Sequence, residues 1–156
     1  MKTKITLLIT LCLAVAPAVL RAEDAQEFAA FFGSLRDDKV NVRAGPGTQY
    51  PILWVYKMDG YPVRVIAKYQ NWLKVRDVEG EEGWVYRNFV SRRQSAIVQS
   101  DSPIALTKDR EGRKIIARLE NGVIARVDKC EVGQCLLVVS GMKGWADKTR
   151  LAMVGK

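Results

Sequence analysis

The stretch Val40-Asn41-Val42-Arg43-Ala44-Gly45-Pro46-Gly47 decides the fold class of this chain. Its first four residues alternate apolar and polar side chains, which is the pattern of a β-strand with one buried face. The next four end the strand, because glycine adopts backbone angles that other residues resist and proline fixes its own φ angle. The stretch therefore predicts a strand that leads into a long, ordered loop.

The alternation continues along the chain in short apolar runs. Turn signals such as Asp59-Gly60 and Tyr69-Gln70-Asn71 separate these runs. The runs predict further strands over residues 52–56, 63–67, 72–76 and 83–86. This spacing leaves little room for a helix, and so many short strands cover a core only by curling into a small barrel or sandwich.

The second half of the chain repeats the pattern. The pairs Gly83-Trp84 and Gly144-Trp145 lie 61 residues apart, and Asp59-Gly60 and Asn121-Gly122 lie 62 apart. Matching order and spacing predict an internal duplication. The corresponding strands are expected over residues 104–107, 115–119, 123–127, 136–139 and 144–146.

Residues 1–22 have the order of regions found in a signal peptide. Lys2 and Lys4 precede an apolar run over residues 5–16, and small residues lead to a cleavage site after Ala22. The apolar run is shorter than the roughly 20 residues that span a bilayer comfortably. We therefore expect a periplasmic or secreted protein with no stable membrane span in its mature chain.

The remaining boundaries follow from shifts in composition. Residues 23–37 form a lead-in segment, whose apolar residues fit either a short helix or an extended segment. The first module is expected over residues 38–93, a linker over 94–102 and the second module over 103–156.

Several landmarks of the first module resemble the bacterial SH3-like domain family. They are the opening stretch 40–47, then Tyr50-Pro51-Ile52, Trp72-Leu73-Lys74-Val75 and Gly83-Trp84-Val85, in that order. The second module lacks the opening stretch and has Gln134 where the family pattern has Trp. The resemblance implies an all-β fold of two tandem SH3-like barrels. It also implies a binding or targeting role in the cell envelope, as in small exported proteins that carry two such domains.

Two cysteines remain once the signal peptide is removed. Cys130 and Cys135 have four residues between them, whereas a redox pair usually has two. The expected compartment is oxidising, and the sequence lacks the four ligands of a structural zinc site. We therefore expect a disulfide between Cys130 and Cys135.

The chain contains no histidine, which excludes histidine-based catalytic triads, Cys-His pairs and histidine metal sites. The acidic residues Glu79, Glu81 and Glu82 lie in one expected hairpin tip, where solvated turn charges are the favoured interpretation. We therefore expect no enzymatic activity, no metal and no cofactor.

The first module contains more aromatic residues than so small a core holds, and exposed aromatic patches often mark binding sites. Alternation places Trp72 on the outer face if Leu73 is buried, while for Trp84 burial in the core is favoured. Our hypothesis is a groove for a peptide or a glycan, in which an arginine pairs with a carboxylate or phosphate. The proposed groove residues are Arg43, Tyr50, Trp72 and Tyr86.

The net charge of the chain is +8 at pH 7. An exported basic protein rarely meets nucleic acid, so anionic envelope polymers or lipid head groups are better candidate partners, and a merely basic, soluble surface is the alternative. We expect a module that recognises cell-wall peptides or an envelope protein. The alternative is an accessory subunit that docks onto another exported protein without binding the wall itself.

Overall fold

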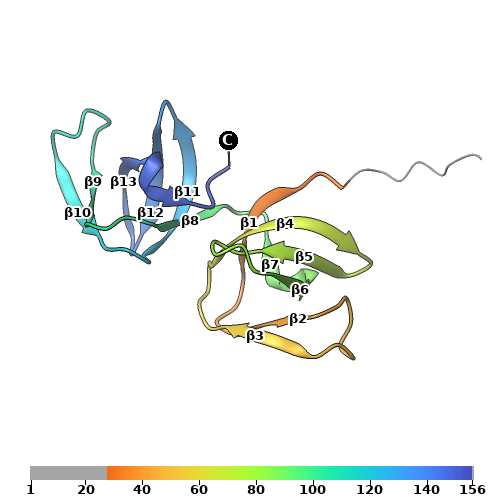
Figure 1. The fold of residues 1–156 in the computed structure, drawn as a ribbon. Coiled ribbons are helices and arrows are strands. Elements are labelled where there is room, and N and C mark those ends of the chain that lie inside the picture. The colour runs from red at the N-terminus through yellow and green to blue at the C-terminus, as the bar shows by residue number, and fades with distance from the viewer. Residues whose placement is uncertain (1–27, 156) are drawn as a thin grey trace, which may run out of the picture.

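The structure, a computed structural model, describes residues 28–155. These residues form an all-β fold whose only helical elements are two short 3-10 turns (Figure 1). Nowhere in this range is there a helix long and apolar enough to cross a membrane. The predicted signal peptide, residues 1–22, lies outside the described residues.

The first module is one seven-stranded antiparallel sheet in the order β3-β2-β6-β5-β4-β1-β7. Its elements are β1 (Phe31–Leu35), β2 (Val40–Arg43), β3 (Ile52–Tyr56), β4 (Pro62–Tyr69), β5 (Trp72–Arg76), β6 (Glu82–Tyr86), the 3-10 turn η1 (Arg87–Phe89) and β7 (Val90–Ser91). The five strands expected from alternation are confirmed here as β2 to β6.

The second module repeats this order strand for strand, as β10-β9-β13-β12-β11-β8-β14. Its elements are β8 (Ser95–Val98), β9 (Ile104–Thr107), β10 (Ile115–Leu119), β11 (Ile124–Glu131), β12 (Gln134–Val139), β13 (Met142–Asp147), the 3-10 turn η2 (Lys148–Arg150) and β14 (Leu151–Ala152). The predicted duplication requires the same strand order in both modules, which the structure has. That the two modules arose by duplication stays a prediction.

Each module has its own hydrophobic core, built from the inward-facing residues of alternating strands. In the first module Val40, Val42 and Val85 are fully buried, while their polar neighbours face outward. A separate cluster around Leu106 and Leu137 fills the second module. The β-branched valines suit strands because they pack well on a pleated surface.

The described part of the lead-in has the extended one of its two expected forms, whereas part of the expected linker is a strand. Of the described lead-in residues, Phe31–Leu35 form β1, which is extended and lies between β4 and β7. Residues 95–98, expected in a linker, form β8 and pair with β11. Both strands are the last but one in their sheets, and their pairings are distant in sequence, so local patterning does not reveal them.

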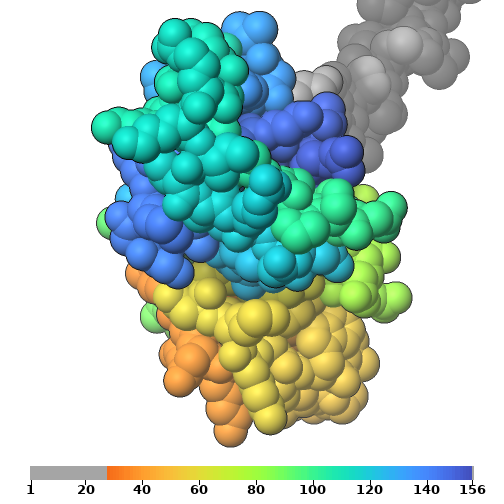
Figure 2. Space-filling model, turned by 90° about the vertical axis from the view of Figure 1, so that its left-hand side faces the viewer, coloured from red at the N-terminus to blue at the C-terminus, as the bar shows by residue number. Residues whose placement is uncertain are grey.

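The two modules contact each other directly, and Figure 2 shows their surfaces adjoining. Three residues, 92–94, connect β7 to β8. The Ser95 hydroxyl donates a hydrogen bond to the Gly60 carbonyl at 2.5 Å. Ile124 of the second module packs against the core of the first. Apolar packing and a buried hydroxyl therefore join the modules.

Candidate functional site

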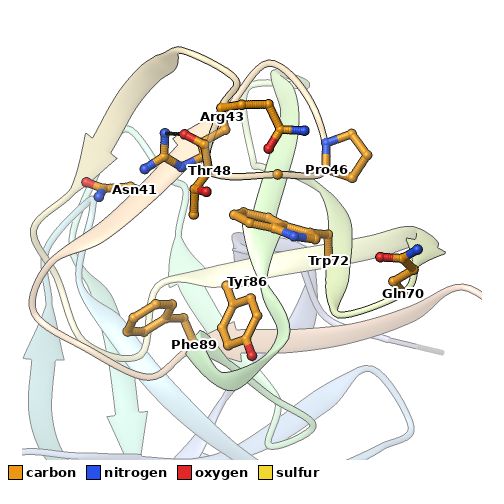
Figure 3. A pocket seen from close by; sticks show the side chains of 10 residues that line it. Asn41, Arg43, Pro46, Thr48, Gln70, Trp72, Tyr86 and Phe89 are labelled. Atoms are coloured by element: carbon orange, nitrogen blue, oxygen red, sulfur yellow. Dashed lines mark hydrogen bonds between the residues drawn. The ribbon is translucent and has the colours of Figure 1, made fainter.

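A pocket of about 580 Å³ opens on the first module, where the β2–β3 loop faces the ends of β5 and β6 (Figure 3). The side chains and backbone that line it are those of Asn41, Arg43, Pro46, Gly47, Thr48, Gln49, Gln70, Trp72, Tyr86 and Phe89. Three aromatic rings and three amide side chains thus face one space, with one arginine and no acidic residue.

Trp72 and Tyr86 form the aromatic floor of this pocket. They are directly paired across β5 and β6, and their rings meet edge to face with centroids 5.6 Å apart. Both side chains are half-buried, because the alternate residues Val75 and Val85 face the core. In Figure 3 the Trp72 ring is seen between Pro46 and Tyr86. The predicted outward position of Trp72 is therefore confirmed.

Arg43 holds the β2–β3 loop in place. Its Nη1 donates to the carbonyl of Thr48 at 3.1 Å and to that of Tyr50 at 2.7 Å. The loop has further backbone hydrogen bonds of its own, from Gly47 to Gly45 and from Tyr50 to Gly47. A guanidinium has five N–H donors, so Arg43 keeps donors for a ligand while it orders the pocket wall.

Tyr50 is the one proposed groove residue that does not line the pocket. Its ring lies against Gly45 of the same loop, where a Cβ added to Gly45 would sit only 2.5 Å from a ring carbon. The ring remains 39% exposed. The structure thus brings Arg43, Trp72 and Tyr86 together and gives Tyr50 a role in packing the loop.

The outer face of β5 and β6 continues away from the pocket as a charged surface. Glu82 accepts hydrogen bonds from Lys74 Nζ at 2.6 Å and from Arg76 Nε at 2.7 Å. These bonds lower the pKa of Glu82 below its ordinary value. Trp84, expected in the core, is half-buried on this outer face, because its neighbour Val85 occupies the inner face.

A buried carboxylate organises the loop that joins β5 to β6. Asp77 is 6% exposed and accepts bonds from the backbone N–H groups of Glu79 and Glu81, both at 2.9 Å. The Tyr56 hydroxyl donates to the same carboxylate at 2.6 Å. Burial and this bond raise the pKa of Tyr56, so it stays a neutral donor. Glu79 and Glu81 are exposed in this turn, as the solvated-turn interpretation expected, whereas Glu82 is the first residue of β6 and forms ion pairs.

On the corresponding face of the second module, the Arg110 side chain covers the surface. Strand pairing places Gln134 and Asp147 where the first module has Trp72 and Tyr86. Arg110 covers this region, with its guanidinium 5.1 Å from the Trp145 ring centroid. The Gln134 amide donates to the Arg110 carbonyl at 3.1 Å. An aromatic pocket like that of the first module is therefore absent from this face.

The predicted disulfide between Cys130 and Cys135 is confirmed. The two residues are directly paired across β11 and β12, at the base of a hairpin whose tip is Val132-Gly133. Between residues 28 and 155, His, Cys, Asp and Glu side chains form no group of three or more able to hold a metal ion.

Sequence reasoning missed several residues of the pocket. Asn41 shares the outward face of β2 with Arg43, so alternation was a usable signal. Gln70 lies in the turn that precedes Trp72. Phe89 reaches the pocket through the 3-10 turn η1, for which the sequence offers no clear signal.

Comparison with known proteins supports the description of the first module. Residues 36–92 match the family model of the bacterial SH3 domain. No curated protein matches the chain. Among solved structures, the chain is similar to NlpC1 from Trichomonas vaginalis, with 14% identity and a TM-score of 0.37 over 82% of this chain and 47% of that one. For NlpC2 from the same organism the identity is 13% and the TM-score 0.37, over 79% and 48%.

The chain thus spans about half the length of each of these two structures. The matched segment contains β2 to β7 of the first sheet and every residue that lines the pocket, whereas β1 precedes it. Residues 36–92 are therefore a bacterial SH3 domain.

Proposed function

We propose that this protein is a non-catalytic, exported recognition module of the cell envelope, which binds cell-wall peptides through the pocket of its first module. The observation that carries the proposal is the lining of that pocket by Trp72, Tyr86 and Phe89 together with amide side chains. The family match of the same segment supports it, because bacterial SH3 domains commonly bind cell-wall components.

The chemistry of the pocket suits a short peptide. Aromatic faces bind apolar groups and Cα–H surfaces, while the amides of Asn41, Gln49 and Gln70 offer both donors and acceptors to peptide bonds. Arg43 is the one charged side chain in the lining, so a ligand with a free carboxylate is favoured over a cationic one.

The proposal is tested by retention on purified sacculi at low and moderate salt. We compare the protein with Trp72→Ala, which removes the pocket floor, and with Tyr69→Ala as a matched control. Tyr69 is an aromatic residue of the same sheet that is 54% exposed and does not line the pocket. Thermal unfolding establishes that each variant is folded.

Salt-resistant retention of the protein and of Tyr69→Ala, with loss in Trp72→Ala, supports the proposal. Retention that salt abolishes equally in all three proteins would show that binding depends only on the general basic charge of the surface. Unchanged retention in folded Trp72→Ala refutes the pocket as the binding site.

A second candidate is an accessory subunit that docks onto another exported protein. The observation in its favour is β3, an edge strand of the first sheet with exposed Ile52 (46%) and Leu53 (50%). Exposed edge strands can accept a further strand from a partner. Co-purification of one stoichiometric protein, without retention on sacculi, would favour this candidate.

A further inference from the structure

A second cleft, of about 430 Å³, lies where the two modules meet. The first module supplies Arg36, directly after β1, and Asp59, in the turn before β4. The connecting residues 92–94 supply Arg93, and β11 of the second module supplies Arg126. The cleft is therefore complete only when both modules are docked as they are in this structure.

The lining of this cleft has a marked excess of positive charge. Arg36, Arg93 and Arg126 line it, against the single carboxylate of Asp59. Within residues 28–155, none of these three arginines forms an ion pair, unlike Arg76 of β5 or Arg110 in the β9–β10 turn. Three arginines and one aspartate leave a net charge of two positive on one recessed surface.

The walls of the cleft are held by buried hydroxyl groups. Ser34 is 6% exposed and donates to the carbonyl of Arg93 at 2.9 Å. Ser95 is 4% exposed and donates to the carbonyl of Gly60 in the turn that carries Asp59. Two of the lining segments are thus fixed to each other before any ligand arrives, which reduces the entropy lost on binding.

We propose that this cleft between the modules binds a phosphate group. The planar guanidinium offers paired donors that match phosphate oxygens, and a phosphate monoester carries close to two negative charges at pH 7. Its charge therefore balances that of the lining. A monocarboxylate would leave one positive charge uncompensated.

Phosphate at this site contacts both modules at once. A ligand that binds only the docked arrangement stabilises it by mass action. The cleft thus acts independently of the aromatic pocket of the first module, which shares none of its lining residues. Failure of wall binding at the pocket and failure of phosphate binding at the cleft are distinguishable outcomes.

The test is calorimetric titration of the purified protein with inorganic phosphate at low salt, using Arg126→Gln and Arg36→Gln. Arg118→Gln is the matched control, because Arg118 is an exposed arginine of β10 outside the cleft. We expect a dissociation constant below about 1 mM, weakened about tenfold or more by either cleft substitution and unchanged in the control.

A second arm distinguishes a lipid head group from free phosphate. The same proteins are sedimented with vesicles that contain phosphatidic acid, whose head group is a phosphate monoester, and with vesicles of phosphatidylcholine alone. Binding to the anionic vesicles that is lost in Arg126→Gln but kept in Arg118→Gln supports the cleft and identifies a head group as the source of the phosphate.

Two results would overturn the proposal. One is phosphate or vesicle binding that falls equally in Arg126→Gln and Arg118→Gln, since this reports only general surface charge. The other is the absence of binding to inorganic phosphate and to anionic vesicles in a folded protein.

Discussion

Replacing Gly83 with Ala should destabilise the first module, although alanine is usually the better residue in a strand. Gly83 lies in β6, directly paired with Val75 of β5. A Cβ added there would lie closer than 3.0 Å to Cγ1 of Val42 and 3.2 Å from the carbonyl oxygen of Arg43. The backbone of Gly83 has no positive φ, so the clash alone opposes the substitution.

Two opposing effects set the magnitude. Alanine recovers about 0.5–1 kcal/mol of the entropy that glycine loses in a strand. Overpacking a well-filled core costs about 1–3 kcal/mol. Val42 is fully buried and β-branched, so it has little freedom to rotate away. Overpacking therefore dominates, and we expect a net loss of about 1–2 kcal/mol in the free energy of unfolding.

Urea unfolding followed by tryptophan fluorescence measures this loss in a double-mutant cycle with Val42→Ala. Val42→Ala removes the methyl groups that the new Cβ would meet, so Gly83→Ala should cost much less in that background. A cost that is equal in both backgrounds would refute the assignment to this contact. A Gly83→Ala variant as stable as the parent would refute the expectation that overpacking outweighs the entropy that alanine recovers.

Three further predictions concern a hairpin turn, the disulfide and the ion pairs of Glu82. Val132 has φ +42° in a two-residue hairpin tip, so Val132→Asn should raise the free energy of unfolding by about 1 kcal/mol, and unchanged urea stability would contradict this. Reducing the disulfide of Cys130 and Cys135 should lower the same quantity by about 2 kcal/mol, with equal stability with and without dithiothreitol as the contrary result. The lowered pKa of Glu82 means that its ion pairs stabilise the fold above about pH 4.3 and that this contribution is lost as the pH falls through the lowered pKa. Glu82→Gln should therefore be less stable at neutral pH and converge with the parent in acid; a difference that persists in acid would exclude this explanation.

Alternation predicted the central strands well because each has one face on a core. It failed for β1, where Gly33, Ser34 and Leu35 are buried in succession. Gly33 is buried because the chain passes close to the carbonyl of Ser91, and Ser34 because its hydroxyl reaches the carbonyl of Arg93. Such partners lie more than 50 residues away, so no local pattern reports them.

The candidate site was predictable only where alternation along a single strand determines the direction of a side chain. The outward direction of Trp72 follows from the burial of Val75, three residues along the same strand and therefore on its opposite face. The parts played by Arg43 and Tyr50 depend on how the β2–β3 loop folds back, and residue type alone does not determine that path. The cleft between the modules depends on the docking of Ile124, which no feature of the sequence indicated.

The three-residue connection between β7 and β8 limits how the protein engages an extended target. Two binding units on a long flexible tether gain avidity, because the first contact raises the effective concentration of the second over a wide range of spacings. Here the connection is too short for the second module to move freely relative to the first, and contacts of Ser95 and Ile124 set its position. Any simultaneous engagement of both modules would therefore occur at one fixed spacing, which would exclude targets whose contact points are spaced differently.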